Sequence, residues 1–104
     1  MLKERVLQIT KEMVGIYSPT NTAEEQKVEA YLLQLLQEMP YFKEHPEHCG
    51  AFACADDCFN RSTIYGLVLG KSKKTVVFMG HHDVVSIEVY GALANFATDV
   101  DTLE

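Results

Sequence analysis

The sequence predicts a layered α/β fold in which two N-terminal helices pack on a partial mixed sheet that contains an antiparallel hairpin. Three observations support this fold class. Apolar residues recur at helical spacing over residues 2–17 and 22–39, and strand-forming residues fill 62–69 and 75–79. The last of these segments is apolar on both faces, which is typical of a strand covered by helices on both sides of a sheet.

The two helices are predicted from their apolar stripes and from the residues at their ends. In the first helix the apolar residues recur at spacings of three and four: Leu2, Val6, Ile9, Met13 and Ile16. Pro19 stops this helix because proline cannot donate to the hydrogen-bond ladder. Thr22 and Glu25 have the spacing of a capping box at the start of the second helix, and Pro40 ends it. The apolar face of the second helix comprises Val28, Tyr31, Leu32, Leu35, Leu36 and Met39.

The strand-forming segments Ser62–Leu69 and Thr75–Met79 are separated by a short polar turn that begins with Gly70. A turn of this length predicts that the two strands pair antiparallel as a hairpin. Residues 41–61 show neither helical nor alternating spacing, so they form a long surface excursion or, around Ala51–Ala55, a short strand. The pattern weakens after residue 86, where a short helix or a packed loop is indicated by Val89, Tyr90, Leu93 and Phe96.

The composition is that of one ordinary globular domain, because 104 residues supply a single core. Fifteen acidic against nine basic residues give a formal net charge of −6, so a basic face for nucleic acid is lacking. The sequence has neither an apolar run near the roughly 20 residues of a membrane span nor the apolar core of a signal peptide. Three cysteines, all within Cys49–Cys58, argue against a disulfide framework. We therefore expect a cytoplasmic protein that binds neither nucleic acid nor membrane.

A candidate site follows the second strand-forming segment directly, in the residues Gly80-His81-His82-Asp83-Val84-Val85. Successive strand side chains point to opposite faces, so His81 and Asp83 project to the same side and His82 to the other. An imidazole can bind a metal while a nearby carboxylate orients the ring and raises its basicity. By spacing alone, a strand-end histidine that is hydrogen-bonded to a turn aspartate remains the alternative.

The whole string from Thr75 to Val85 resembles the first metal-binding motif of the zinc-dependent exopeptidase and aminoacylase family, which includes carboxypeptidase G, acetylornithine deacetylase and succinyl-diaminopimelate desuccinylase. In that family a hydrophobic strand leads into Gly-His-x-Asp-x-Val. The chain looks most similar to the arginine-utilisation branch, RocB, in the residues Met39-Pro-Tyr-Phe42, Asn60-Arg-Ser62 and Glu88-Val-Tyr-Gly91. The resemblance implies that residues 1–104 are the N-terminal part of a zinc-peptidase-like catalytic domain, with no second domain in this chain.

The same resemblance implies the chemistry. His81 matches the first zinc ligand, and Asp83 matches the catalytic-site aspartate that orients and polarises the metal site. In the family two zinc ions share a bridging carboxylate, a glutamate acts as general base, and the substrate is a peptide or an N-acyl amino acid. The glycine-rich segment with the bridging aspartate and the later Glu-Glu pair do not occur here, and Asp99 and Asp101 are expected to be solvated loop acids. Because catalytic zinc needs three protein ligands, we expect the chain alone to be inactive.

A non-catalytic metal-binding or interaction module is the alternative function. It rests on five ligand-type residues within fourteen positions: His45, His48, Cys49, Cys54 and Cys58. Their spacing is not the paired Cys-x2-Cys arrangement of common zinc modules, so free thiols in a loop are the competing interpretation. A third expectation is a homo-oligomer formed through an exposed sheet edge, because unpaired edges favour pairing with a second copy.

Overall fold

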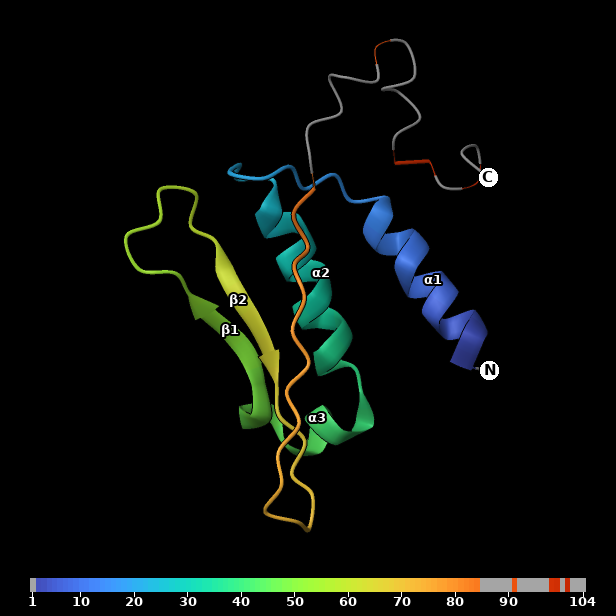
Figure 1. The fold of residues 1–104 in the computed structure, drawn as a ribbon, viewed down its shortest axis with the longest axis vertical. Coiled ribbons are helices and arrows are strands. Elements are labelled where there is room, and N and C mark those ends of the chain that lie inside the picture. The colour runs from blue at the N-terminus through green and yellow to red at the C-terminus, as the bar shows by residue number, and fades with distance from the viewer. Residues whose placement is uncertain (1, 85–90, 92–97, 100, 102–104) are drawn as a thin grey trace.

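The computed structural model describes residues 2–84, 91, 98, 99 and 101. Figure 1 shows a helical layer beside a two-stranded sheet, so the predicted mixed α/β class is confirmed. The elements in chain order are α1 (Leu2–Val14), α2 (Glu25–Gln37), α3 (Pro40–Glu44), the 3-10 turn η1 (Pro46–His48), β1 (Cys49–Ala53) and β2 (Ser62–Gly66). No helix in the described part of the chain is long and apolar enough to cross a bilayer.

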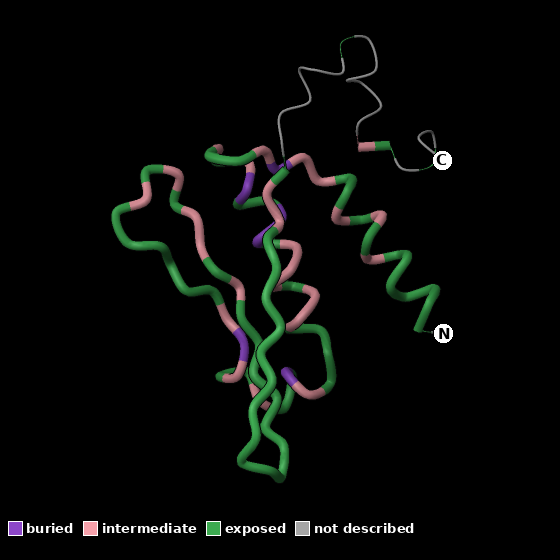
Figure 2. Tube along the Cα trace, viewed as in Figure 1, coloured by how far each residue is buried: buried purple, intermediate pink, exposed green. Residues whose placement is uncertain are grey.

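The first helix forms where its apolar stripe predicts, but it contributes little to the core. α1 contains no buried residue, whereas α2 contacts both strands and supplies the packing between helix and sheet (Figure 2). Two polar contacts attach α1 to the rest of the chain: the Tyr31 hydroxyl of α2 donates to Glu12, and Lys11 Nζ lies 2.7 Å from Asp101 Oδ1. The expectation that both helices pack on the sheet therefore holds for α2, and α1 is attached beside it.

The start of α2 differs from the predicted capping box. The Thr22 hydroxyl donates to the Pro19 carbonyl at 2.7 Å, and the Glu25 carboxylate accepts the Asn21 N–H at 3.0 Å. Glu24, at the N-cap position, makes no side-chain cap. The capping-box prediction is wrong because the Thr22 hydroxyl closes the turn that precedes the helix and does not reach the helical N–H groups.

The sheet consists of β1 and β2, which pair antiparallel from Cys49↔Gly66 to Ala53↔Ser62. The short strand left open for residues 51–55 is therefore present, two residues earlier. The core lies between this hairpin and the helices, where Val28, Phe42 and Cys49 are only 1%, 6% and 7% exposed (Figure 2). Gly66 permits this packing, because a Cβ there would lie 3.0 Å from Cζ of the Phe42 ring.

The main difference from the predicted fold concerns residues 75–79, the second strand of the predicted hairpin. After β2 the chain runs to a turn at the far end of the molecule and returns along its length to the segment before α2 (Figure 1). Residues 75–79 form no strand, and the apolar side chains from Val76 to Met79 are 73–93% exposed. β2 uses β1 as its pairing partner, so the prediction that 75–79 pairs with 62–69 and is covered on both faces is wrong.

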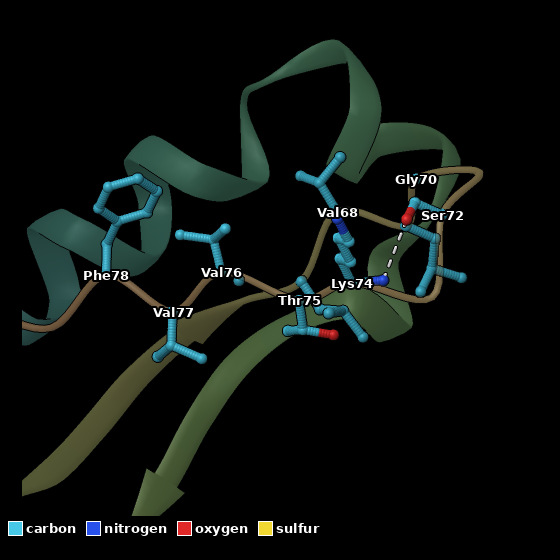
Figure 3. Close-up of a pocket in the computed structure, with 11 residues that line it drawn as sticks. Val68, Gly70, Ser72, Lys74, Thr75, Val76, Val77 and Phe78 are labelled. Carbon is cyan, nitrogen blue, oxygen red and sulfur yellow. Dashed lines mark hydrogen bonds between the residues drawn. The ribbon is translucent and has the colours of Figure 1, made fainter.

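The two arms of this excursion are separated by an open gap of about 500 Å³, lined by residues 66–70 on one side and 72–78 on the other (Figure 3). The Lys74 N–H donates to Ser72 Oγ at 3.1 Å and closes the turn between the arms. The short helix or packed loop expected around residues 89–96 lies outside the described residues, Gly91 excepted.

Candidate functional site

His81 and Asp83 face each other at the end of the returning arm. The His81 Nδ1 atom lies 3.0 Å from Asp83 Oδ1 and 3.3 Å from the Asp83 carbonyl oxygen. The His81 side chain is 85% exposed. Because Nδ1 is directed at the carboxylate, Nε2 on the opposite edge of the ring is the nitrogen directed away from it. The structure thus brings the two predicted site residues together on one side, as alternation of the side chains predicts.

The segment before α2 holds this motif in place. The Thr20 N–H donates to the Val84 carbonyl and the Val84 N–H donates to the Ser18 carbonyl, both at 2.8 Å, so the two segments run parallel. Ser18 is only 1% exposed, and its hydroxyl donates to the His82 carbonyl at 2.7 Å. Residues that the sequence assigned only to the end of a helix therefore position the candidate site.

The Asp83 carboxylate is held in its ionised form. The Thr20 hydroxyl donates to Asp83 Oδ2, and this hydrogen bond is the main cause that lowers the pKa of Asp83 below its usual value of 3.8, followed by the hydrogen bond with His81. An ionised carboxylate beside Nδ1 favours the tautomer in which that nitrogen carries the proton. The sequence does not indicate that Thr20 binds Asp83, because the two residues lie 63 positions apart.

His82 points away from the His81–Asp83 pair and towards Glu29 of α2, as expected for the residue between two same-side neighbours. Its side chain is 21% exposed, and its Nε2 lies 3.9 Å from Oε1 of Glu29 on α2. Glu29 is buried and accepts the Ser62 N–H at 3.0 Å. Among the described residues the buried His82 Nδ1 has no hydrogen-bond partner.

An open depression of about 400 Å³ adjoins the motif. Its walls are residues 80–83, residues 62–64 of β2, and side chains from the helical layer, Met13, Glu25 and Leu32. This volume exceeds that of a hydrated ion and accommodates a small polar molecule.

Arg61 holds Glu25, one of the residues that line this depression, in position. Its Nη1 lies 3.1 Å from Glu25 Oε2 and 3.0 Å from Asn21 Oδ1, while Nε and Nη2 contact the two oxygens of Asp57 at 2.8 and 3.0 Å. These hydrogen bonds from Arg61 lower the pKa of Asp57 to about 2. The bidentate geometry ties the loop between β1 and β2 to the start of α2.

A second group of ligand-type side chains lies at the junction of α3 and β1. His45, Glu47 and His48 present ligand atoms that all lie within 4.8 Å of one another. None of the three cysteines joins this group in the described part of the chain; Cys49 is buried, and Cys54 and Cys58 are exposed, all as free thiols. The five-residue cluster considered in the sequence is thus reduced to its two histidines. Glu47 was not among the residues predicted from the sequence, although His45-x-x-His48 around Pro46 indicates a turn that brings such groups together.

The chemistry of the donors fits a metal at His81 in part. A catalytic zinc site takes three protein ligands, and one of them is commonly an imidazole whose second nitrogen donates to a carboxylate. The described residues around the motif supply one such imidazole, His81, and one such carboxylate, Asp83. The pair is therefore suited to one corner of a metal site.

The protein is thus a mixed α/β segment that presents a histidine whose ring is oriented by a carboxylate. In comparison with known proteins, the chain is similar to protein RocB of Bacillus subtilis, with 31% identity over 96% of this chain and 18% of RocB. It is also similar to the uncharacterized protein YqjN of the same organism, with 34% identity over 91% of this chain and 17% of YqjN. The chain therefore spans less than a fifth of the length of these relatives. No family model and no solved structure matches it.

Proposed function

We propose that residues 1–104 are the N-terminal part of the catalytic domain of a RocB-like, zinc-dependent amide hydrolase. The observation that carries this proposal is the His81–Asp83 contact of 3.0 Å, which orients an exposed imidazole beside an open depression. The similarity to RocB over nearly the whole chain supports a RocB-like origin. The resemblance of residues 75–85 to a zinc-binding motif supports the hydrolase assignment.

In this proposal each residue of the motif has a distinct part. His81 would bind the metal through Nε2, while Asp83 orients the ring by accepting a hydrogen bond from Nδ1. Thr20 and Ser18 position the motif through the hydrogen bonds described above. When bound, a zinc ion would polarise the amide carbonyl of the substrate and lower the pKa of a bound water molecule. We propose that the substrate is a peptide or an N-acyl amino acid. The resemblance to the RocB branch implies that the reaction belongs to arginine utilisation.

One histidine ligand does not complete a catalytic zinc site, which requires three protein ligands. We therefore propose that the bridging carboxylate, the general base and the remaining ligands of the two expected zinc ions lie in other parts of the catalytic domain. The 104-residue chain alone is accordingly expected to be inactive. Three free cysteines favour a reducing compartment such as the cytoplasm for the whole protein.

A chimera tests the proposal. In Bacillus subtilis RocB, the segment that matches this chain is replaced by residues 1–104, and zinc content and hydrolysis of a panel of N-acyl amino acids and dipeptides are measured. We expect zinc-dependent hydrolysis, which His81→Ala reduces by at least about 1,000-fold together with a loss of bound zinc. Asp83→Asn is expected to weaken zinc binding by about 10- to 100-fold, because it acts through the ring of His81.

The matched control is His82→Ala, which removes the neighbouring imidazole, whose Nε2 faces Glu29 and not Asp83. It should leave zinc content unchanged. A folded chimera that holds no zinc, or one whose zinc content and hydrolysis are insensitive to His81→Ala, contradicts the proposal.

The partner that we propose for the exposed arm is a second copy of the chain. Residues 76–79 present a continuous apolar row that is 73–93% exposed, and apolar surface of this kind favours association. Backbone groups along a segment without strand partners add to that tendency.

A further inference from the structure

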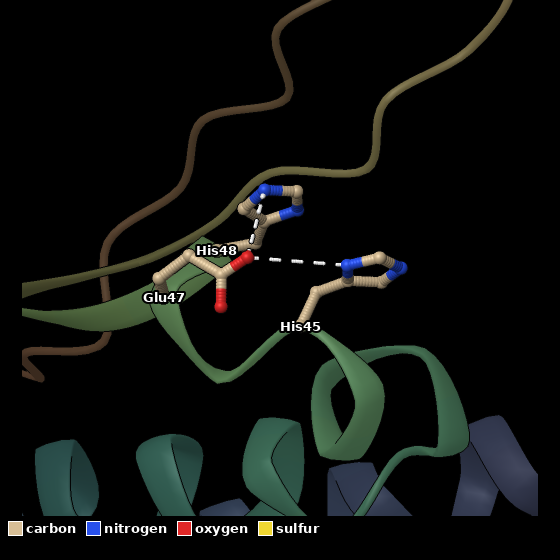
Figure 4. Close-up of side chains that lie close together, drawn as sticks. All are labelled: His45, Glu47 and His48. Atoms are coloured by element: carbon tan, nitrogen blue, oxygen red, sulfur yellow. Dashed lines mark ion pairs between the residues drawn. The ribbon is translucent and has the colours of Figure 1, made fainter.

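The junction between α3 and β1 places two imidazoles around one carboxylate, independently of the His81 motif. His48 Nε2 lies 3.4 Å from Glu47 Oε1, and His45 Nδ1 lies 3.9 Å from the same oxygen. Figure 4 shows an ion pair from that oxygen to each of the two rings. Ligand atoms at about 2.0–2.2 Å from a tetrahedral ion lie roughly 3.3–3.6 Å from one another. One contact therefore already has the ligand–ligand spacing of such a site, and the other needs a few tenths of an ångström. The two histidine nitrogens, which lie within 4.8 Å of each other, have to approach as well.

The two rings lie close together at this junction. Their centroids are 5.0 Å apart with an angle of 9° between the planes, so the imidazoles stack nearly parallel. Pro46 begins the short turn η1 and limits the backbone between the two histidines, because its ring fixes one dihedral angle. The lone pair of an imidazole nitrogen lies in the plane of its ring, so one of the two rings has to turn about its side-chain bonds before both nitrogens face one ion.

Tyr41 supports His48 from behind. The Tyr41 hydroxyl lies 3.0 Å from His48 Nδ1 and accepts the Leu69 N–H at 3.0 Å, so its position is fixed by the outgoing arm of residues 66–70. When Nδ1 donates to this hydroxyl, the lone pair of Nε2 is directed at the Glu47 side. His48 is the most buried of the three groups, with a side chain that is 17% exposed. A hydrogen-bonded group behind a ligating imidazole is the usual arrangement in metal sites.

We propose that His45, Glu47 and His48 form a second divalent-metal site, distinct from the His81 motif, with Zn²⁺ as its natural ion. Two imidazoles and one carboxylate suit zinc and its first-row neighbours better than Mg²⁺ or Ca²⁺, which prefer oxygen ligands. Three protein ligands leave one position for water or for a group from a partner. The ion joins the end of α3 to the start of β1 and therefore stabilises the fold of this segment.

Zinc titration of the 104-residue chain tests this site without requiring catalytic activity. We expect one tight equivalent of Zn²⁺ by calorimetry, and a Co²⁺ spectrum without thiolate-to-metal charge transfer. His45→Ala and His48→Ala should each weaken zinc binding by more than about 100-fold, since a ligand matters more than the outer groups that change affinity 10- to 100-fold. Glu47→Gln should weaken it by at least about 10-fold, and Tyr41→Phe by about 10-fold, as a positioning residue behind His48.

Two matched controls separate this site from its rivals. His81→Ala, which removes the imidazole of the proposed catalytic site, should leave the affinity unchanged, and so should the double variant Cys54→Ser/Cys58→Ser. Glu47 has a side chain that is 67% exposed, so Glu47→Gln remains informative if a histidine variant fails to fold. Failure of this site leaves the chimera experiment on His81 unaffected.

The proposal is overturned by any of three results. The chain binds no zinc tightly, or the affinity survives His45→Ala and His48→Ala together, or it is lost with the cysteines and retained without the histidines. The last result would return the site to the cysteine-containing module. Circular dichroism of each variant establishes that the comparison is between folded proteins.

Discussion

The half of the molecule formed by α2 and the β1–β2 hairpin buries Val28 and Cys49 and partly buries the leucines of α2. The two arms of the excursion, residues 67–84, expose their apolar side chains. Val28 on α2 is 1% exposed, and Phe78 on the arm is 93% exposed, although both lie in strongly apolar segments. The arm is nevertheless held at its end, where residues 82–84 pair with 18–20. An apolar segment therefore predicts surface that tends to be buried. It does not predict that neighbouring elements in the chain will bury it.

The largest expected effect concerns association through the arm. We expect the chain to form dimers or larger oligomers, and Phe78→Lys to weaken them by about 10- to 100-fold, because one fully buried Phe is worth about 1.5–3 kcal/mol. Sedimentation velocity over a range of concentrations measures this change. Leu2→Lys on α1 is the control, since Leu2 is 77% exposed but belongs to another surface. A monomer at the highest concentration would refute the proposed partner.

The second effect contrasts the two regions directly with one type of substitution. Val28→Ala should lower the free energy of unfolding by about 2 kcal/mol, because the side chain is fully buried and leaves a cavity. Val76→Ala should change it by less than about 0.5 kcal/mol, because Val76 is 76% exposed. Urea unfolding of the two variants supplies both values. Equal losses would mean that the arm is packed in solution and that the contrast between the regions is wrong.

The third effect is the dependence of thermal stability on pH, which arises in the packed half of the molecule. Hydrogen bonds from Arg61 hold the pKa of Asp57 at about 2, below its usual 3.8. A lowered pKa stabilises the fold above the unfolded value, and this stabilisation is lost as the pH falls from about 4 to about 2. Thermal unfolding across this range should therefore show a declining midpoint, and Asp57→Asn should flatten the decline. An unchanged slope in the variant would show that another group causes it.

Much of the fold could be predicted from the sequence because its signals are local. The periods of α1 and α2 fixed both helices within a few residues. The partner of β2 could not be predicted, since Cys49–Ala53 has few strand-forming residues while Thr75–Met79 has many. Pairing with β1 is decided by the packing of α2, α3 and Phe42 on the hairpin, which is a tertiary effect that overrides the propensity of the later segment.

The candidate site divides in the same way. Alternation along an extended chain sufficed to predict that His81 and Asp83 face each other and that His82 does not. Thr20 and Ser18 could not be predicted, because they reach the motif from more than 60 positions away. At the second site the histidines were recognised, but Glu47 was not, since an exposed glutamate carries no signal until the turn η1 places it beside them.

The central claim is that Asp83 fixes the ring of His81 with Nδ1 protonated and Nε2 directed outward. The most direct test is the tautomer of the neutral His81 ring, measured from the nitrogen and carbon shifts of the imidazole by NMR. The structure predicts the Nδ1–H tautomer in the original chain and the loss of that preference in Asp83→Asn. A ring that carries its proton on Nε2 while Asp83 is intact would contradict the account.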